Sequence, residues 1–223
     1  MNNYQKGARS VREKYRQARE EMIENQLKRR GIDDGKILEA FRQVPRHEFV
    51  PEKNRHKAYR DHPLPIGEEQ TISQPYIVAY MMEKIKPEGD NRLLEVGSGC
   101  GYVLALLAEI AAEVYGVERR SSLVEMSRKN LKDLGYDLEI KHGDGTRGWS
   151  EKSPFDGIIV SAAAGKIPDH LKKQLAIGGR MIIPISRKVF QQQLVLVKRT
   201  GGGRYDTRKL NPVRFVPLLE GKE

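Results

Sequence analysis

The stretch that decides the fold runs from residue 94 to residue 102 and reads Leu94-Glu95-Val96-Gly97-Ser98-Gly99-Cys100-Gly101-Tyr102. It follows a short apolar run typical of a buried strand and opens a longer apolar run typical of a helix. Glycines at such a strand-to-helix turn permit a tight turn and let backbone N–H groups approach a ligand at the helix N-terminus. The stretch therefore predicts a ligand site at the carboxyl end of a buried strand.

Strand and helix patterns alternate on the C-terminal side of this turn. Strands are expected at Arg92–Val96, Val114–Val117, Leu138–Lys141, Gly157–Ser161 and Arg180–Ile185, and helices at Tyr102–Ala112, Ser121–Leu134 and Ile167–Leu175. Such alternation predicts an α/β fold with a doubly wound, mostly parallel Rossmann-like sheet. Two further apolar runs, Leu194–Lys198 and Val213–Leu218, flank the glycines at 201–203 and predict a terminal antiparallel hairpin.

The residues before the turn predict a helical extension and an irregular loop. Helices are expected at Arg12–Arg30, at Asp33–Val44 with Asp33 or Asp34 as N-cap, and at Ile77–Ile85 with Ser73 or Gln74 as cap. Five of the eleven prolines fall between residues 45 and 75, which favours an ordered loop there. We expect one domain over residues 1–223 with three parts: residues 1–75 with the N-terminal helices and the loop, 76–190 with the βαβ core, and 191–223 with the hairpin.

Length and composition bound the class of protein. With 223 residues, 38 % hydrophobic and 31 % charged, the chain fits one folded domain and not a disordered polymer. We find no apolar run near the roughly 18 residues that span a bilayer and no signal-peptide pattern at residues 1–30. The single cysteine, Cys100, cannot form an internal disulfide. These features predict a reduced, cytoplasmic protein without a membrane partner.

The net charge of +10 is concentrated in two segments. Residues 1–30 and residues 198–214 each carry +5, and the rest of the chain is close to neutral. We interpret both segments as solvated faces with at most a weak attraction for acidic substrates, because neither interleaves its charges with aromatic residues along one groove. No nucleic-acid partner is expected, and a monomer is predicted.

Three carboxylates follow or end predicted strands at one edge of the sheet. The glycine spacing is G-x-G-x-G, not the G-x-G-x-x-G of dinucleotide folds, and Glu95 precedes it, which favours a cationic, amino-acid-like ligand over a pyrophosphate. Glu118 lies 21 residues beyond Gly97, where a carboxylate can accept both ribose hydroxyls. Asp144, next to Gly145, could accept from an adenine amino group. Together they predict a nucleoside site.

This combination resembles the class I S-adenosylmethionine-dependent methyltransferases, and five segments resemble one family of them, the protein-L-isoaspartate O-methyltransferases. The segments are Val44-Pro45-Arg46-His47-Glu48-Phe49-Val50-Pro51, Leu64-Pro65-Ile66-Gly67, Gln70-Thr71-Ile72-Ser73-Gln74-Pro75, Gly143-Asp144-Gly145 and Ala162-Ala163-Ala164. Their order and spacing are matched from about Met22 to Leu218. Thr-Ile-Ser followed by Gln-Pro is the segment most specific to that family.

The resemblance implies protein repair, with a methyl group transferred from S-adenosyl-L-methionine to the free carboxylate of isoaspartyl residues and S-adenosyl-L-homocysteine as product. Activity on D-aspartyl residues stays open. Ser73 would be the active-site serine, and the cofactor would be held by a larger set: Ile72, Ser73, Gly97, Ser98, Gly99, Gly101, Glu118, Asp144 and Gly145. No function is carried onto Leu219, where some relatives have threonine, or onto the basic residues before Met22.

The expected chemistry needs neither a general base nor a metal. A carboxylate with a pKa near about 4 is ionised at neutral pH, so the methyl transfer requires alignment alone and its rate should be nearly flat from about pH 6 to 8. The five scattered histidines and the single cysteine offer no metal-ligand pattern. Two alternatives remain: a nucleic-acid methyltransferase, although residues 161–165 lack the Asn/Asp-Pro-Pro-aromatic segment, and a non-enzymatic S-adenosylmethionine-binding protein.

Overall fold

The computed structural model describes residues 3–188 and 191–223, with side chains described at 13–186 and 191–223. A seven-stranded sheet with the order β5-β4-β3-β6-β7-β8-β9 forms its centre. The strands are β3 (Arg92–Val96), β4 (Glu113–Glu118), β5 (Glu139–His142), β6 (Phe155–Val160), β7 (Leu175–Lys188), β8 (Gln191–Gly201) and β9 (Arg204–Val213). Neighbours from β5 to β7 are parallel, whereas β7, β8 and β9 are antiparallel. The predicted α/β class with a mostly parallel sheet is confirmed.

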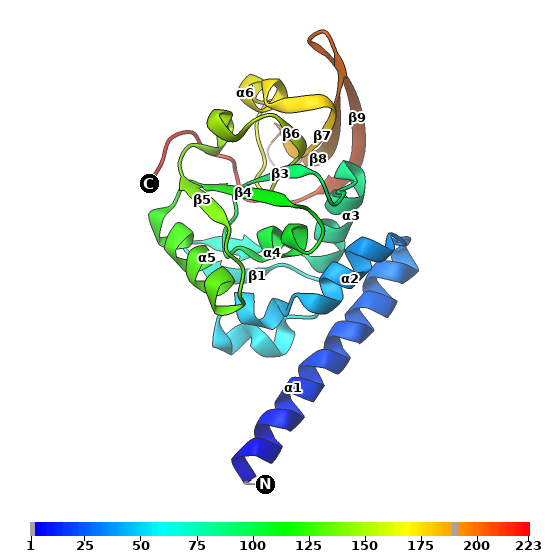
Figure 1. Cartoon of the computed structure of the whole chain (residues 1–223), viewed down its shortest axis with the longest axis vertical. Helices are drawn as coiled ribbons and strands as arrows, with labels where there is room; N and C mark the ends of the chain where they lie inside the picture. Colours follow the sequence, from blue (N-terminus) through cyan, green and yellow to red (C-terminus); the bar gives the residue numbers. More distant parts are fainter. Residues whose placement is uncertain (1–2, 189–190) are drawn as a thin grey trace.

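Helices cover both faces of the sheet. They are α1 (Asn3–Met22), α2 (Gly35–Gln43), α3 (Pro75–Ile85), α4 (Tyr102–Ala108), α5 (Ser121–Asp133) and α6 (Asp169–Lys173). Figure 1 shows α6 on one face and α2, α4 and α5 on the other. Among the described residues, no helix has both the length and the apolar character needed to cross a membrane.

Strand β3 is buried from both sides, as expected for an inner strand of a parallel sheet, and its residues from Leu93 to Val96 are all buried. Leu93 belongs to the hydrophobic cluster that includes α3, α4 and α5, whereas Leu94 and Val96 belong to the cluster on the α6 face. All three side chains have no exposed surface. The glycine turn therefore starts from one of the most tightly packed strands of the molecule.

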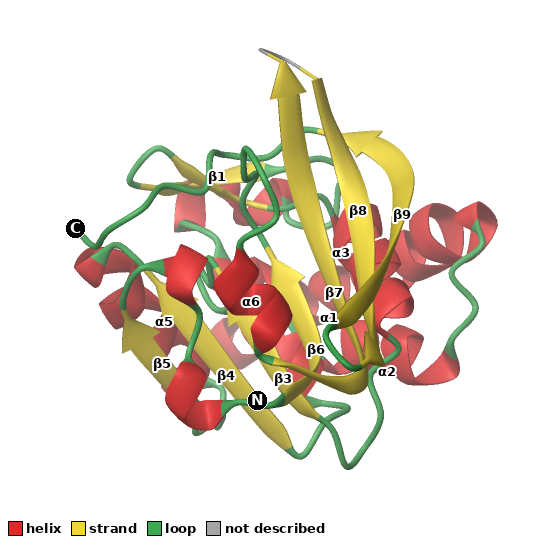
Figure 2. Cartoon of the chain, turned by 90° about the horizontal axis from the view of Figure 1, so that it is seen from above, coloured by secondary structure: helices red, strands yellow, loops and turns green. Residues whose placement is uncertain are grey.

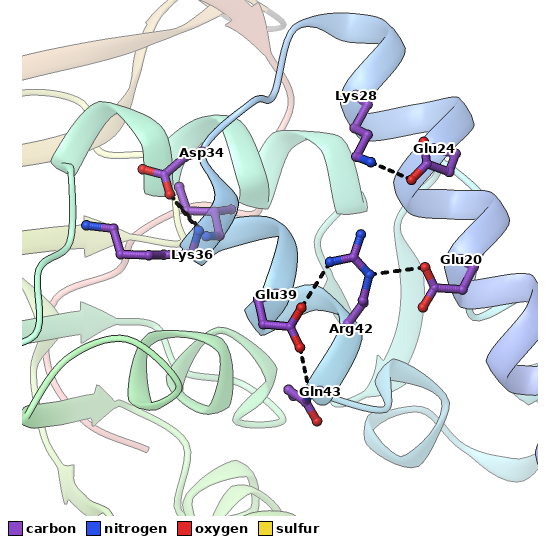
Figure 3. Close-up of polar contacts among 9 residues, drawn as sticks. Glu20, Glu24, Lys28, Asp34, Lys36, Glu39, Arg42 and Gln43 are labelled. Atoms are coloured by element: carbon purple, nitrogen blue, oxygen red, sulfur yellow. Dashed lines mark hydrogen bonds and ion pairs between the residues drawn. The ribbon is translucent and has the colours of Figure 1, made fainter.

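The N-terminal helix is longer than predicted and projects from the body (Figure 1). It continues through a π-helical turn (Ile23–Leu27) and a 3-10 turn (Lys28–Arg30), so the segment ends at Arg30 as predicted, with Gly31 as C-cap at φ 86°. Tyr15 stacks on His47 at 4.0 Å between ring centroids. Figure 3 shows Arg42 of α2 between Glu20 of α1 and Glu39, which ties the two helices together.

The proline-rich segment holds more regular structure than expected. Strands β1 (Leu64–Gly67) and β2 (Gln70–Ile72) form a separate two-stranded antiparallel sheet, and 3-10 turns span Arg46–Phe49 and Glu52–Lys57. The prediction of an irregular loop was wrong for this hairpin. Its turn carries Glu68 and Glu69 at φ 51° and 56°, positions where glycine or asparagine would have signalled a hairpin.

The C-terminal hairpin is confirmed, but its second arm was misplaced. Strand β9 ends at Val213, and the β7–β8–β9 ribbon curls away from the parallel strands in Figure 2. The expected arm Val213–Leu218 instead returns to the sheet, where Pro217 forms a parallel bridge with Ala163. We call residues 214–223 the C-terminal strap. It brings Leu218 beside the strand ends where the ligand site was expected.

Candidate functional site

A pocket opens at the carboxyl ends of β3 and β4. Six segments that are distant in the sequence line it: the end of the small hairpin, the glycine turn with the start of α4, the end of β4 with the start of α5, Gly145 after β5, the residues after β6, and the C-terminal strap. The lining consists of Gln70, Thr71, Ile72, Ser73, Glu95, Gly97, Ser98, Gly99, Cys100, Tyr102, Val103, Val117, Glu118, Arg119, Arg120, Leu123, Gly145, Ser161, Ala162, Val216, Pro217, Leu218 and Leu219. Seven of the nine predicted cofactor residues are among them; Gly101 and Asp144 are not.

The glycine turn is held open by backbone conformation. Gly97, Gly99 and Gly101 have φ values of 81°, 52° and 88°, which L side chains rarely adopt. Gly101 is the N-cap of α4, and a Cβ there would meet Leu131 and Ser127 of α5 at 3.1 to 3.2 Å. Gly101 therefore packs the turn against α5 instead of lining the pocket, so direct ligand contact falls to Gly97 and Gly99.

Glu118 lies where the sequence placed it, at the end of β4 and inside the pocket. Its side chain is buried, and its oxygens accept hydrogen bonds from Gly99 N at 3.0 Å and Arg120 N at 3.1 Å. A carboxylate oxygen has two lone pairs, so each can accept one further donor. Glu118 thus anchors the glycine turn and still offers two acceptor sites to a ligand.

Glu95 is a buried carboxylate of the pocket lining with one unsatisfied oxygen. Ser161 Oγ donates to its Oε1 at 2.7 Å, while its buried Oε2 has no hydrogen-bond partner among the described residues. Burial, reinforced by the nearby charge of Glu118, raises the pKa of Glu95 to about 8 although the Ser161 hydrogen bond lowers it. A cationic ligand group beside Oε2 would satisfy this atom and favour the ionised carboxylate.

Ser73 reaches the pocket from the other side. Of the two residues predicted as the cap of α3, Gln74 holds the N-cap position and Ser73 does not. The N-cap of α3 is Gln74, and no side chain there bonds back to the first turn. The Ser73 hydroxyl forms no hydrogen bond with any residue that the structure describes. Its Oγ is therefore available to a ligand.

Asp144 is close to the pocket but lies outside its lining. Its Oδ1 accepts from Thr146 N at 2.9 Å and Thr146 Oγ1 at 2.7 Å, and its Oδ2 accepts from Gly221 N at 2.9 Å. Although burial opposes them, the hydrogen bonds from Gly221 and Thr146 lower the pKa of Asp144. The neighbouring Gly145 does line the pocket, and a Cβ there would meet Val96 at 2.6 Å. The adenine contact of Asp144 stays a prediction.

The C-terminal strap is a wall of the site that the sequence reasoning missed. Ala163 N donates to Val216 O at 2.7 Å, and Leu218 N donates to Ala163 O at 2.8 Å. Leu219, to which no function was assigned, is 46 % exposed at the pocket. The apolar run 213–218 was a visible signal, but its partner is a loop far away in the sequence, which no local pattern identifies.

No metal centre is found in the described part of the chain, where no three side chains of His, Cys, Asp or Glu converge. Two histidines near the site serve as structural hydrogen-bonding groups. His47 contacts the Tyr59 hydroxyl at 2.7 Å, and His142 Nε2 contacts Arg119 O at 2.9 Å. Neither residue lines the pocket.

Comparisons with known proteins agree on one family. Residues 17–223 match the family described as Protein-L-isoaspartate(D-aspartate) O-methyltransferase. The chain is 49 % identical over 202 residues to Protein-L-isoaspartate O-methyltransferase 2 of Marinobacter nauticus, covering 90 % of this chain and 92 % of that protein. It is 48 % identical to a Methylorubrum populi protein-L-isoaspartate O-methyltransferase, covering 92 % and 96 %.

A solved structure with 31 % sequence identity to this chain has the same fold. It is described as a Plasmodium falciparum protein-L-isoaspartate O-methyltransferase in complex with S-adenosyl-L-homocysteine. The TM-score is 0.78 at 31 % identity, and the alignment covers 89 % of this chain and 96 % of that one.

Proposed function

Because this chain belongs to the protein-L-isoaspartate(D-aspartate) O-methyltransferase family, we propose that the pocket at the ends of β3 and β4 is the place of its methyl transfer. The enzyme transfers a methyl group from S-adenosyl-L-methionine to the free carboxylate of L-isoaspartyl residues, giving a methyl ester. The observation that carries the location is the meeting of Glu118, the unpartnered Glu95 Oε2 and the free Ser73 hydroxyl in one pocket. D-aspartyl residues are a further proposed substrate.

The residues present fit the cofactor, which supplies an electrophilic methyl group on a sulfonium. Glu118 would accept the two ribose hydroxyls, and Glu95 Oε2 would receive the α-ammonium group, the one cation an amino-acid end offers. Gly97, Ser98 and Gly99 would approach the ligand through their backbone, and Ile72 would pack on it. Gly145, with Asp144 behind it, would border the adenine. The buried orphan oxygen of Glu95 is the feature that supports an ammonium ligand in this pocket.

Ser73 would orient the carboxylate of the substrate. A carboxylate is ionised at neutral pH, so no residue needs to remove a proton from it. What the protein must supply is alignment of a carboxylate oxygen with the methyl carbon, and alignment of this kind can contribute several orders of magnitude in rate. The Ser73 hydroxyl can donate one hydrogen bond to the second carboxylate oxygen. That bond would fix the substrate relative to the pocket.

The same geometry would separate isoaspartyl from aspartyl residues. In an isoaspartyl residue the chain continues through the side-chain carbonyl, so the free carboxylate lies one methylene closer to the backbone. The pocket is bounded on the substrate side by Ser73, which directly follows β2, and by Ser161 and Ala162, which directly follow β6. A displacement of about 1 Å can cost around a hundredfold in rate, so only one of the two carboxylates would react.

We also propose that the enzyme acts as a cytoplasmic monomer without a nucleic-acid or membrane partner. The concentration of positive charge in two segments, away from the pocket lining, supports the part of this proposal that concerns nucleic acid. Light scattering would report the mass in solution, and 25.4 kDa is expected.

One labelling experiment tests the function. The enzyme is incubated with methyl-labelled S-adenosylmethionine and, separately, an isoaspartyl peptide, its aspartyl counterpart and RNA. We expect label on the isoaspartyl peptide alone, and its loss in mild base, as for a methyl ester. Label on RNA that survives base would support the nucleic-acid alternative instead, and no transfer at all would support the binding protein.

A further inference from the structure

We propose that Asp61 is a positioning residue that sets the place of Ser73 from outside the pocket, an inference that rests on the proposed role of Ser73. Asp61 lies in the loop before β1 and is absent from the pocket lining. Its carboxylate nevertheless binds both residues that flank Pro75, the first residue of α3. Three groups donate to this carboxylate: Tyr76 N, Gln74 Nε2 and the Arg30 guanidinium.

Helix α3 begins without a cap of its own. Gln74 occupies the N-cap position with no side-chain hydrogen bond, and Pro75 has no N–H to offer. Tyr76 N is therefore the first N–H of the helix, and it donates to Asp61 Oδ1 at 3.3 Å. A carboxylate at this end also interacts favourably with the helix dipole. Asp61 thus supplies from a distant loop the cap that the local sequence lacks.

The second carboxylate oxygen holds the residue next to Ser73. Gln74 Nε2 donates to Asp61 Oδ2 at 2.7 Å, and Arg30 donates to the same oxygen at 2.6 Å. The Asp61 side chain is only 25 % exposed. The Gln74 side chain is therefore fixed to a partly buried charge.

Arg30 fixes the carboxylate itself. It ends the N-terminal helical segment immediately before Gly31, and its guanidinium lies over the Tyr76 ring with Cζ 3.3 Å from the centroid. Arg30 therefore contacts the start of α3 twice, through the ring of Tyr76 and through Asp61. These contacts of Arg30 join the end of the first helical segment to the start of α3 in one contact unit.

Ser73 lies between this unit and the small hairpin. On its N-terminal side, Ile72 pairs with Leu64 in the β1–β2 sheet. On its C-terminal side, Gln74 is held by Asp61. Since the Ser73 hydroxyl has no hydrogen-bond partner among the described residues, the hydrogen bonds that hold Ser73 in place are those of its two flanks. Releasing Gln74 should let Ser73 shift by a distance that matters for alignment.

The test compares Asp61→Ala with a matched cap variant, Asp34→Ala. Asp34 caps α2, where its Oδ1 accepts from Lys36 N at 2.9 Å and Ile37 N at 3.3 Å, as Figure 3 shows for Lys36. Titration with S-adenosylhomocysteine counts the folded sites and gives their Kd. For Asp61→Ala we expect full stoichiometry, a Kd within about threefold of wild type, and kcat per site at least about tenfold lower. Asp34→Ala should have a lower melting temperature than wild type but an unchanged kcat per site.

Two further variants make the outcome decisive. If Asp61 acts through Ser73, the double variant Asp61→Ala/Ser73→Ala should have nearly the same kcat per site as Ser73→Ala, because the two effects are not additive. Asp61→Asn keeps an acceptor for Tyr76 N but removes the charge that pairs with Arg30, so its kcat per site should lie between those of wild type and Asp61→Ala. If Asp61→Ala does not fold, Asp61→Asn takes its place in the comparison.

Three results would overturn the inference: unchanged kcat per site, a loss of kcat matched by an equal loss of cofactor affinity, or full additivity with Ser73→Ala. A wild-type enzyme that does not methylate the isoaspartyl peptide would instead contradict the proposed function.

Discussion

Replacing Glu95 by glutamine should remove a pH dependence from cofactor binding. The buried Glu95 has a pKa of about 8 and a free Oε2, so it is mostly protonated at neutral pH before the ligand arrives. In the proposed binding mode, the α-ammonium of the ligand lies beside Oε2 and favours the ionised form. Binding should therefore release a proton from this carboxyl group, and affinity should rise with pH until Glu95 is ionised in the free enzyme.

The magnitude follows from the fraction of enzyme that is already ionised. With a pKa of about 8, roughly a tenth of Glu95 is ionised at pH 7 and about a half at pH 8, so the apparent Kd should fall about fivefold over that interval and about tenfold between pH 6 and pH 7. The tenfold change corresponds to about 1.4 kcal/mol. The turnover number at saturating cofactor should stay flat, as the ionised substrate carboxylate predicts.

Isothermal titration with S-adenosylhomocysteine in buffers of different ionisation enthalpy measures both quantities. Wild type should release about 0.9 proton per site at pH 7, whereas Glu95→Gln should release none and show a Kd independent of pH. Glu125→Gln, on the exposed face of α5 and outside the pocket lining, is the matched control and should behave as wild type. A wild-type Kd that is flat from pH 6 to 7.5, or an unchanged slope in Glu95→Gln, would refute the reasoning.

Three other outcomes are expected from the same site. Glu118→Ala should weaken S-adenosylhomocysteine binding by at least about tenfold, since hydrogen bonds to a buried carboxylate contribute about 1.5 to 3 kcal/mol each. It should also lower the melting temperature, because Gly99 N and Arg120 N lose their acceptor. A Kd within a few-fold of wild type in calorimetry would contradict the ribose assignment. Ser73→Ala should leave the melting temperature unchanged, because the hydroxyl caps nothing, while kcat per site drops about tenfold or more; full kcat would leave Ser73 without a role in turnover. The raised pKa of Glu95 should make the cofactor-free enzyme lose stability as pH rises from about 4.5, the unfolded value, through about 8, and Glu95→Gln should flatten melting temperature against pH in that window.

Local sequence signals placed the parallel strands and the glycine turn. The apolar run of β3 and the positive-φ glycines that follow it depend on residues adjacent in the chain, so their pattern is readable without a structure. Glu118 could be placed in the pocket for the same reason, because strand ends of a parallel sheet share one edge. The resemblance to the methyltransferase family added Ser73 and Ile72, which spacing alone did not single out.

The remaining features depend on contacts between distant segments. Leu218 lines the pocket because the strap pairs with Ala163. Asp144 accepts a hydrogen bond from Gly221, which also belongs to the strap. The cap of α3 comes from Asp61, so neither Ser73 nor Gln74 needs to provide it. Local propensity predicts a cap from the nearest polar residue, and it fails where a distant carboxylate is better placed.

The most direct test of the account is the ratio of kcat/KM for two peptides that differ only in one residue, isoaspartate or aspartate. Both carry the same charge and the same flanking sequence, so binding of the rest of the peptide cancels. If the pocket aligns one carboxylate with the methyl group, the ratio should exceed about a hundredfold in favour of isoaspartate, with the methyl ester lost in mild base. Comparable kcat/KM values for the two peptides would contradict the central claim that alignment by this pocket selects the damaged residue.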